Sequence, residues 1–479
     1  MTRCGIGILM KKLTRNNKKC VGYIALVFFW IGMLVPAQVR GITIQEEEEL
    51  SREFMKVVFQ QYEVLKDPVI DDYVNEIGNK ILSKLPPQPF KYHFYVVKED
   101  VYNAFATPAG HIFVNSGLFA AMENEEELAG ILSHEISHVS ARHISQKIER
   151  SKKAQVATLA GIVAGALLGV GGAGTAANAV TMGSMAAGQS IMLAYSREDE
   201  IQADQMGLEI LKKAGYSGSG LLTMLEKIRA KDWFGSNIPT YLKTHPASED
   251  RITYIDSWLV RNHNVKSAGD EYKFKRAQAF LVANYGDKET ALRLFEQDVQ
   301  KQPEDAMAHY GYGLVLARSG NREAAAVHIK SALEKNAFDP YILKDLGKIY
   351  FFDGHYEKAL NIFENSLGIG QNDPESLLFK GRSQLELGRL EAATVSLEDL
   401  VRKDPKYTQA YYFLGEVYGK QGRMSEAHYY LGIYYHRKGQ VRNAIFHLNR
   451  ALNGINDSEK RRNIEDRLKV LRKIPQDQQ

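Results

Sequence analysis

The chain has 479 residues, of which 44% are hydrophobic and 25% charged, and its 61 Lys and Arg residues nearly balance 57 Asp and Glu residues. This length predicts two or more domains. The near-neutral balance excludes a protein that binds nucleic acid through a broad basic surface.

The first 37 residues are typical of an export signal. A basic stretch precedes an uncharged apolar run from Val21 to Val35, and Val35-Pro36-Ala37 offers a small-residue cleavage site. Both cysteines, Cys4 and Cys20, lie in this segment, so the mature chain would have no thiol, which suits an oxidising compartment. An uncleaved anchor is the alternative, because the run approaches the roughly 20 residues that cross a bilayer.

Residues 45–84 have the periodicity of two amphipathic helices. The first opens on an acidic run from Glu46 to Glu49, which suits the positive end of a helix dipole. From Lys91 the pattern changes to the alternation of a strand. One side of this strand carries Tyr92, Phe94 and Val96, and the other carries His93, Tyr95 and Val97.

Two more short strands are predicted at residues 103–106 and 111–115, about a turn at residues 107–110. An edge strand can bind an extended chain through main-chain hydrogen bonds with little regard to its sequence. Asn103, Ala104 and Phe105 are therefore candidates for a substrate-binding edge. A hairpin with a purely structural role explains the same pattern.

The sequence His134-Glu135-Ile136-Ser137-His138 can build half of a zinc-hydrolase site. Histidines four residues apart on a helix point the same way, so His134 and His138 can bind one metal ion. Glu135 would then lie beside the metal, where it can take a proton from a zinc-bound water. An apolar stripe that buries the other side of this helix consists of Leu132, Ile136 and Val139.

A catalytic zinc needs three protein ligands and an open position, so another ligand must come from elsewhere in the chain. Glu200 is the candidate, because it opens a second helix-compatible stretch. Asp204 lies four residues later on the same face, where it can hydrogen-bond the outer nitrogen of a ligating histidine. A proton-donor role for Asp204 is the alternative. His111 and His143 are predicted to be structural, because neither belongs to the pair at helical spacing.

An apolar segment from Val156 to Val170 is followed by a stretch rich in Gly, Ala and Ser up to Ala194. Its apolar part is too short to cross a membrane comfortably. We predict packed helices with a glycine-broken loop around residues 169–174. A mobile flap over the active site is the alternative.

Beyond residue 270 the chain is periodic. Glycines recur at intervals of 34 residues, at Gly313, Gly347, Gly381 and Gly415. Alanines follow each glycine by twelve residues, at Ala325, Ala359, Ala393 and Ala427. This tetratricopeptide pattern predicts paired antiparallel helices that pack closely at small residues. Large side chains that fill the remaining space are Phe295, Ile329, Phe363, Leu397 and Leu431.

The register of the repeats changes near residue 430. Gly432 and Ala444 lie twelve residues apart, but only seventeen after Gly415 and Ala427. One helix is therefore predicted to serve two successive repeats. The stacked repeats should form a curved solenoid with a concave face for partners.

Several segments together resemble the HtpX-type and prenyl-protease-type zinc endopeptidases. They are the run Asn103-Ala104-Phe105-Ala106, the helix from His134 to His143, residues 196–204, and Thr244-His245-Pro246 with Arg251. The resemblance implies one zinc ion per subunit bound by His134, His138 and Glu200. It also implies Glu135 as general base and Asp204 as a supporting or proton-donating residue.

With the signal and the repeats, nearly the full length is similar to repeat-containing relatives of the Gram-negative periplasm. This implies a role in outer-membrane quality control. The implied partners are misfolded or stalled outer-membrane proteins and, through the repeats, the barrel assembly machinery, with a peripheral membrane association.

His245 could add a fourth ligand. If its imidazole reaches the metal, the open position is filled and the enzyme rests in a latent state until the loop moves. A histidine that merely orders the Pro246 loop is the alternative.

We therefore predict an α+β zinc metallopeptidase domain, with a zincin helix and a small sheet, followed by an all-α tetratricopeptide solenoid. The predicted boundaries are 1–37 for the signal, 41–265 for the peptidase domain, 270–455 for the repeats, and 456–479 for a C-terminal helix and polar tail. The predicted function is an exported zinc endopeptidase that degrades misfolded envelope proteins and assists outer-membrane β-barrel assembly. The alternative is a chaperone or adaptor in which the repeats carry the role and proteolysis is mostly latent.

Overall fold

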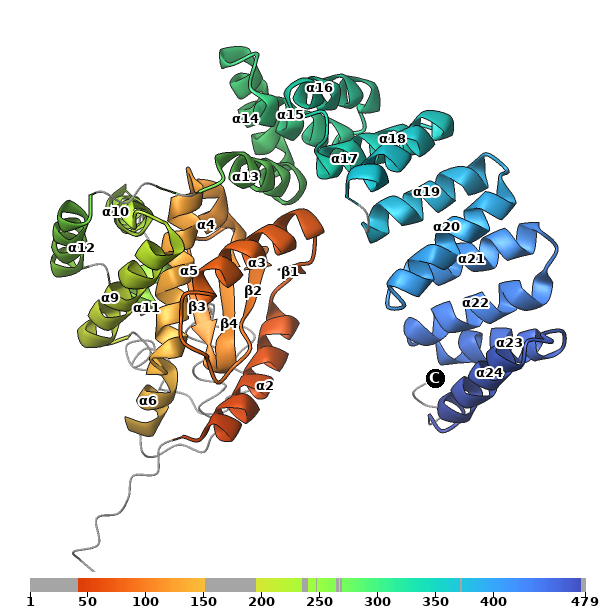
Figure 1. Ribbon diagram of the computed structural model, residues 1–479, viewed down its shortest axis with the longest axis horizontal. Helices are drawn as coiled ribbons and strands as arrows, with labels where there is room; N and C mark the ends of the chain where they lie inside the picture. The colour runs from red at the N-terminus through yellow and green to blue at the C-terminus, as the bar shows by residue number, and fades with distance from the viewer. Residues whose placement is uncertain are drawn as a thin grey trace, which may run out of the picture.

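The computed structural model describes residues 42–150, 195–234, 240–246, 248–263, 267, 269–370 and 373–474. An N-terminal domain, residues 42–263, is followed by a helical solenoid that begins at α13 and arcs away from it (Figure 1). The predicted export signal, the apolar segment up to Ala194 and the end of the polar tail lie outside the described residues. Within the described ranges, no helix has the length and hydropathy of a membrane span.

A four-stranded sheet lies at the centre of the N-terminal domain. Its strands are β1 (Val64–Leu65), β2 (His93–Val97), β3 (Ala104–Thr107) and β4 (His111–Asn115), in the order β1-β2-β4-β3. β2 and β4 are parallel, whereas β1 and β3 pair antiparallel with their neighbours. β3 is therefore an edge strand. The predicted turn between β3 and β4 is confirmed, and Gly110 in it has a positive φ of 92° that glycine adopts without strain.

Helices cover both faces of the sheet. α3 (Pro68–Leu82) and α5 (Glu125–Ser140) pack on the face that carries Phe94 and Val96, and α2 (Ile44–Gln61) packs on the face that carries Phe105 and Phe113. The predicted strand alternation and the two N-terminal helices are thus confirmed. The sequence did not predict β1. This strand has only two residues, too few to show an alternating pattern, and it forms because it pairs with β2.

The helix that carries the His-Glu-x-x-His motif, α5, runs through the interior, and all its residues from Glu125 to Val139 are buried. Acids in its first turn contact different neighbours. Glu125 accepts hydrogen bonds from the hydroxyls of Tyr73 and Tyr216, at 2.9 and 2.7 Å. Glu127 forms an ion pair with Lys227 at 2.8 Å. These buried contacts fix the start of the helix.

Further helices complete the N-terminal domain. They are α4 (Ser116–Ala121), α6 (His143–Arg150), α9 (Arg197–Ala214), α10 (Ser219–Phe234), α11 (Thr240–Thr244) and α12 (Glu249–Arg261). α9 and α10 both pack along α5. In Figure 1, α5 accordingly lies between these helices and the sheet.

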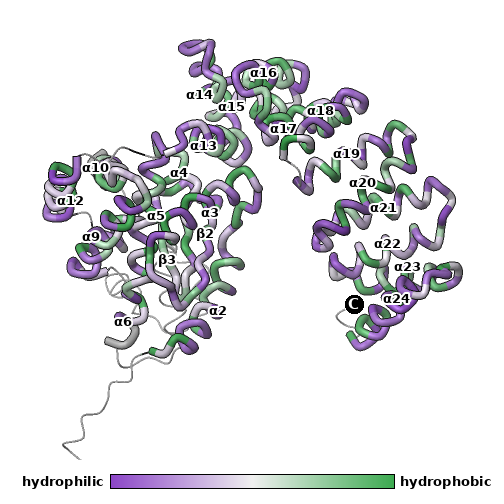
Figure 2. Tube along the Cα trace, viewed as in Figure 1, coloured by the Kyte–Doolittle hydropathy of each residue, from purple (hydrophilic) through white to green (hydrophobic). Residues whose placement is uncertain are grey.

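The solenoid consists of antiparallel helices whose hydrophobic residues alternate with hydrophilic ones along the chain (Figure 2). Its first helices are α13 (Glu271–Tyr285), α14 (Lys288–Lys301), α15 (Ala306–Arg318), α16 (Arg322–Lys335), α17 (Pro340–Phe352) and α18 (Tyr356–Ile369). It continues with α19 (Pro374–Glu386), α20 (Leu390–Lys403), α21 (Thr408–Lys420), α22 (Met424–Arg437), α23 (Val441–Leu452) and α24 (Ser458–Leu471).

The helix pairs pack at the periodic glycines, as predicted. A Cβ atom added at Gly313 would lie 2.7 Å from the side chain of Ile329, so any larger residue would force that side chain to move. The same contact recurs between Gly347 and Phe363, Gly381 and Leu397, and Gly415 and Leu431. α22 supplies Leu431 to the close contact with Gly415 of α21 and Gly432 to the close contact with Leu448 of α23, so one helix serves two successive repeats, as predicted.

The solenoid packs directly on the N-terminal domain. α13 contacts α3 and α4, and the rings of Phe119 and Phe274 lie 5.9 Å apart between their centroids. The backbone N–H of Asp270 donates to Glu125 at 3.0 Å. One hydrophobic core continues from the sheet into the first repeats. The start of α5 is therefore bonded to the first solenoid helix.

Substitution of Gly130 by Ala tests the close packing of α5 against α10. Alanine alone would favour the helix by about 1 kcal/mol. Here, however, the new Cβ would lie 2.6 Å from the backbone nitrogen of Leu221, which cannot rotate away. We expect the free energy of unfolding to fall by about 1–3 kcal/mol in a denaturant titration.

The matched control is Gly368→Ala in α18, where nothing lies within 4 Å of the added Cβ. It should leave the free energy of unfolding unchanged or raise it. A Gly130→Ala variant as stable as this control would contradict the packing described.

Candidate metal centre

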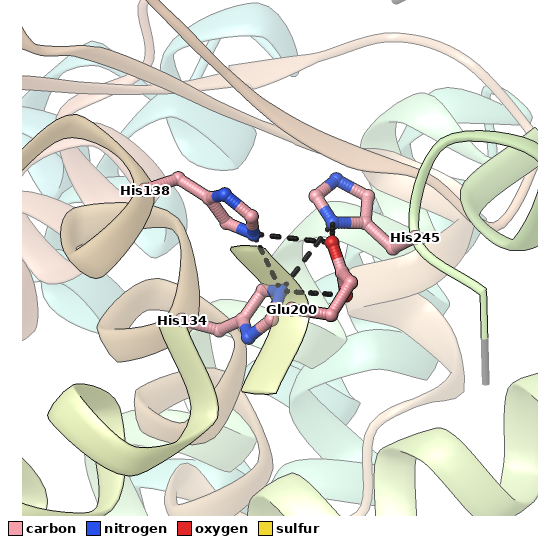
Figure 3. A group of neighbouring side chains, drawn as sticks. All are labelled: His134, His138, Glu200 and His245. Atoms are coloured by element: carbon pink, nitrogen blue, oxygen red, sulfur yellow. Dashed lines mark hydrogen bonds and ion pairs between the residues drawn. The ribbon is translucent and has the colours of Figure 1, made fainter. Parts of the chain in front are cut away.

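Four buried side chains converge at one point of the N-terminal domain: His134, His138, Glu200 and His245. Figure 3 shows the imidazoles of His134 and His138 pointing from one helix toward the Glu200 carboxylate and the His245 ring. One ligand atom from each residue lies within 4.8 Å of all the others. This is the only such group of metal-binding side chains among the residues that the structure describes.

The spacing of these atoms fits a four-coordinate ion. Ligands about 2.0–2.1 Å from a tetrahedral zinc ion stand roughly 3.3 Å apart. His134 Nε2 lies 3.0 Å from His138 Nε2 and 3.3 Å from His245 Nδ1. Glu200 Oε1 lies 3.3 Å from His138 Nε2 and 3.0 Å from His245 Nδ1. A divalent cation between these atoms would accept all of their lone pairs at once.

Helical spacing and caps place the donors. His134 and His138 lie on one face of α5, as their separation of four residues predicts. Glu200 lies in the first turn of α9, which begins with a reciprocal capping box between Ser196 and Asp199. Gly207 lets α9 approach α5, because an added Cβ would lie 3.3 Å from Ser133 Oγ.

Asp204 and Arg251 hold His134 and Glu200 in place. Asp204 Oδ1 lies 2.9 Å from His134 Nδ1, the ring nitrogen that faces away from the convergence point. The buried Arg251 guanidinium bonds both Asp204 oxygens, at 2.7 and 2.8 Å, and lies 2.5 Å from Glu200 Oε2. It also donates to the carbonyl of Pro246 at 2.9 Å, which connects the His245 loop to the same group.

His143 fixes the second imidazole in a similar way. Its Nδ1 lies 2.9 Å from His138 Nδ1, and its Nε2 lies 3.0 Å from the side-chain oxygen of Gln202 on α9. His143 is therefore outside the group of candidate ligands, as predicted. His111 is also outside this group, and its Nδ1 lies 3.1 Å from the hydroxyl of Tyr95.

The charges of the site follow from burial and from Arg251. Burial raises the pKa of Glu200, but Arg251, His245 and His134 outweigh it and hold that pKa well below its ordinary value. Asp204 behaves in the same way, with Arg251 the largest opposing influence on its pKa. Burial lowers the pKa of His138 well below its ordinary value. The two carboxylates are thus ionised and His138 is uncharged, the forms that bind metals. At His134, burial is outweighed by Asp204 and Glu200, which raise the pKa of this imidazole to about 9, so a metal ion that binds there must displace a proton.

Glu135 and two tyrosines border the donors. Both Glu135 oxygens are buried, and Oε1 lies 3.7 Å from His245 Nε2. The ring of Tyr241 stacks on His245 at 4.5 Å between centroids, and Tyr195 lies 3.8 Å from the ring of His138. These aromatic rings keep the imidazoles in fixed orientations.

The structure brings together the side chains that the sequence proposed for the site: His134, Glu135, His138, Glu200, Asp204 and His245. The predicted edge residues Asn103, Ala104 and Phe105 lie at or just before β3, which contacts α5. Sequence reasoning assigned no role to Arg251. Its position in the sequence could have indicated a buried ion pair. A positive side chain in the first turn of α12 lies at the positive end of the helix dipole, which is unfavourable unless acids compensate it.

Comparison with known proteins agrees with this geometry. Residues 67–259 match the model of peptidase family M48, which contains zinc-dependent metallopeptidases. This part of the chain belongs to peptidase family M48. Residues 267–340 and 378–427 match a tetratricopeptide repeat model. The protein is therefore a zinc metallopeptidase with a repeat region, which confirms the predicted fold class, enzyme class and cofactor.

Curated relatives of this M48 peptidase include bacterial and mitochondrial enzymes. The chain is 26% identical over 387 residues to the beta-barrel assembly-enhancing protease of Yersinia pestis, covering 77% of this chain and 75% of that one. It is 25% identical to the protein of the same name in Escherichia coli, covering 69% and 68%. It is 28% identical to the mitochondrial metalloendopeptidase OMA1 of Saccharomyces cerevisiae, covering 45% and 57%.

Substitution of Arg251 by Lys tests the charge network of this peptidase. Lysine keeps the positive charge but lacks the planar fork that bonds Asp204 and Glu200 together. Residues that orient metal ligands strengthen metal binding. We therefore expect the zinc affinity of this variant to fall about 10–100-fold, measured in competition with a chelating dye.

The control is Arg261→Lys at the exposed end of the same helix. Its zinc affinity should match that of the parent. If Arg251→Lys also retained parental affinity, the guanidinium would not position the site.

Proposed function

We propose that this M48 peptidase is exported to the periplasm, where it degrades misfolded or misassembled envelope proteins and, through its repeats, assists outer-membrane β-barrel assembly. The observation that carries the catalytic part is the convergence of three imidazoles and the Glu200 carboxylate beside Glu135. The names of the bacterial relatives and the repeats support the part in barrel assembly.

The residue roles follow from the distances. His134, His138 and Glu200 would hold the zinc ion. When bound, zinc polarises a peptide carbonyl and makes a water molecule more acidic. Glu135 accepts the proton of the attacking water and delivers it to the leaving amine. Arg251 occupies both oxygens of Asp204, so we assign Asp204 to orienting the His134 imidazole rather than to donating protons.

We further propose that β3 binds the substrate as an added strand. The N–H of Asn115 donates to the carbonyl of Asn103, so residues 103 and 115 form a hydrogen-bonded pair. Such pairs alternate along antiparallel strands, so the backbone groups of Ala104 and Ala106 point away from β4, toward a buried side on which no strand of the described residues pairs. The Ala106 amide interacts with the Glu135 carboxylate, so a chain paired to this edge would pass the catalytic residues.

His245 is proposed to hold the enzyme in a latent form. Its Nδ1 occupies the fourth corner of the donor group, where a catalytic zinc site keeps its open position. Its loop is anchored by the stacked Tyr241 ring and by the Tyr195 N–H, which donates to the Thr244 carbonyl at 3.0 Å. Displacement of this loop would open the site.

An adaptor function is the second candidate, and the buried His245 favours it. If the latch seldom opens, the repeats carry the biological role and cleavage is rare.

Substitution of Glu135 by Gln distinguishes the two candidates. Glutamine is isosteric but accepts no proton, so we expect zinc content to be retained while casein hydrolysis falls about 10²–10⁴-fold. The matched control is Glu123→Gln, an exposed acid before α5 that pairs with Lys227. Full hydrolysis by Glu135→Gln would contradict the base assignment, and rescue of a deletion strain by an inactive variant would favour the adaptor.

Substitution of His245 by Ala tests the latch. Removing the fourth donor should vacate a corner of the site and raise peptide hydrolysis several-fold at unchanged zinc content. The control is His263→Ala, an exposed histidine of the same segment. Unchanged hydrolysis with intact zinc would leave His245 with the role of ordering the Pro246 loop.

A further inference from the structure

Two pairs of histidines each join the two helices of one repeat. His309 on α15 lies beside His328 on α16, and His428 on α22 lies beside His447 on α23. In both pairs, the first histidine lies four residues before the close-packed glycine and the second lies three residues after the alanine that follows it. The pairs therefore occupy equivalent positions in two repeats that are far apart in the chain. These glycines are Gly313 and Gly432, and these alanines are Ala325 and Ala444.

Packing of the repeat does not require histidine at these positions. Other repeats hold aliphatic, hydroxyl or phenol side chains there and still form the close contact at their glycines. The equivalent pairs are Leu343 with Ile362, Leu377 with Ser396, and Tyr411 with Tyr430. All four histidines are half-buried, so solvent reaches them. The helix packing therefore does not account for the imidazoles.

In each pair the two rings direct the same nitrogen toward each other. Nδ1 of His309 lies 2.8 Å from Nδ1 of His328, and Nδ1 of His428 lies 2.9 Å from Nδ1 of His447. The ring centroids are 5.0 Å apart in both pairs, so the rings diverge from the two nitrogens. A single proton can bridge two such nitrogens as a hydrogen bond, and a single metal ion can bind both of them.

The lone pairs that a metal ion needs are available. Nε2 of His309 donates to the carbonyl oxygen of Pro303 at 3.0 Å, which leaves the lone pair of this ring on Nδ1. Burial, with a smaller contribution from the neighbouring imidazole, lowers the pKa of His328 and the pKa of His447. These two rings are therefore uncharged at neutral pH, which is the form that binds metals.

The separation of the two nitrogens indicates which kind of ion fits. Donors about 2.0 Å from a metal ion stand roughly 2.8 Å apart at the right angle of a square-planar or tetragonal shell, and roughly 3.3 Å apart at a tetrahedral angle. The observed separations of 2.8 and 2.9 Å agree with the right angle. Cu(II) and Ni(II) adopt this geometry with nitrogen and oxygen ligands, and of the two Cu(II) binds more tightly.

We propose that each of these histidine pairs binds one Cu(II) ion through its two Nδ1 atoms, with water in the remaining positions of the shell. Within the described ranges, no third imidazole or carboxylate joins either pair, so the protein supplies two ligands to each ion. On binding, the ring that donated the hydrogen bond moves its proton to Nε2. The ion then connects the two helices of one repeat. These sites are separate from the zinc centre, whose candidate ligands all lie in the N-terminal domain.

The test loads the full chain with zinc, dialyses it against a small excess of Cu(II), and counts both metals by atomic emission. We expect the parent chain to take up two more copper ions than a variant with both His309→Gln and His428→Gln, at equal zinc content. Each single substitution should remove one of these two ions. The matched control is His355→Gln, which should keep both, because this exposed histidine of the solenoid lies 3.4 Å from Asp353 rather than beside another imidazole.

Electron paramagnetic resonance of the copper-loaded parent chain identifies the ligands. We expect the spectrum of tetragonal Cu(II) with hyperfine splitting from imidazole nitrogens. Three results would each overturn the proposal: equal copper uptake by the parent and the double variant, uptake that occurs only as zinc is lost, and a spectrum without nitrogen splitting. If a variant fails to fold, the spectrum and the zinc content of the parent chain still decide.

Discussion

The active site depends on one buried guanidinium. Arg251 bonds both oxygens of Asp204 and also reaches Glu200, and all three residues are at most 1% exposed. Two carboxylates could not stay ionised at this depth without compensation, because the desolvation of an isolated charge costs several kcal/mol. The arginine supplies part of that compensation, and a bound metal cation would add to it. Glu200 can therefore face the cation, and Asp204 can face the outer nitrogen of His134.

The rest of the N-terminal domain keeps this charge cluster rigid. α5 is buried along its length, and its first-turn acids bond the neighbouring helices and the first backbone amide of the solenoid. α9 approaches α5 at a glycine, and aromatic rings pack against the imidazoles. A metal site needs its donor atoms fixed to within fractions of an ångström, and dense packing around the site holds them there. At the junction, Glu125 bonds the start of the helix that carries His134 and His138 to the backbone amide that caps the first solenoid helix.

Local patterns in the sequence predicted much of this structure. The spacing of His134 and His138 along one helix predicts a shared metal site. The period of 34 residues from Gly313 to Gly415 predicts the stacked repeats. The contact of Arg251 with Asp204 joins segments 47 residues apart and leaves no periodic trace, so only the folded chain reveals it. β1 was missed because two residues carry no pattern.

The central claim is that imidazole nitrogens and one carboxylate oxygen surround a single zinc ion. X-ray absorption at the zinc edge of the purified full chain tests it most directly. The account predicts one zinc per chain in a four-coordinate shell of nitrogen and oxygen at about 2.0–2.1 Å, without sulfur, and fewer imidazole neighbours after His138→Ala. A chain without zinc, or a shell of oxygen atoms alone that does not change in that variant, would contradict it.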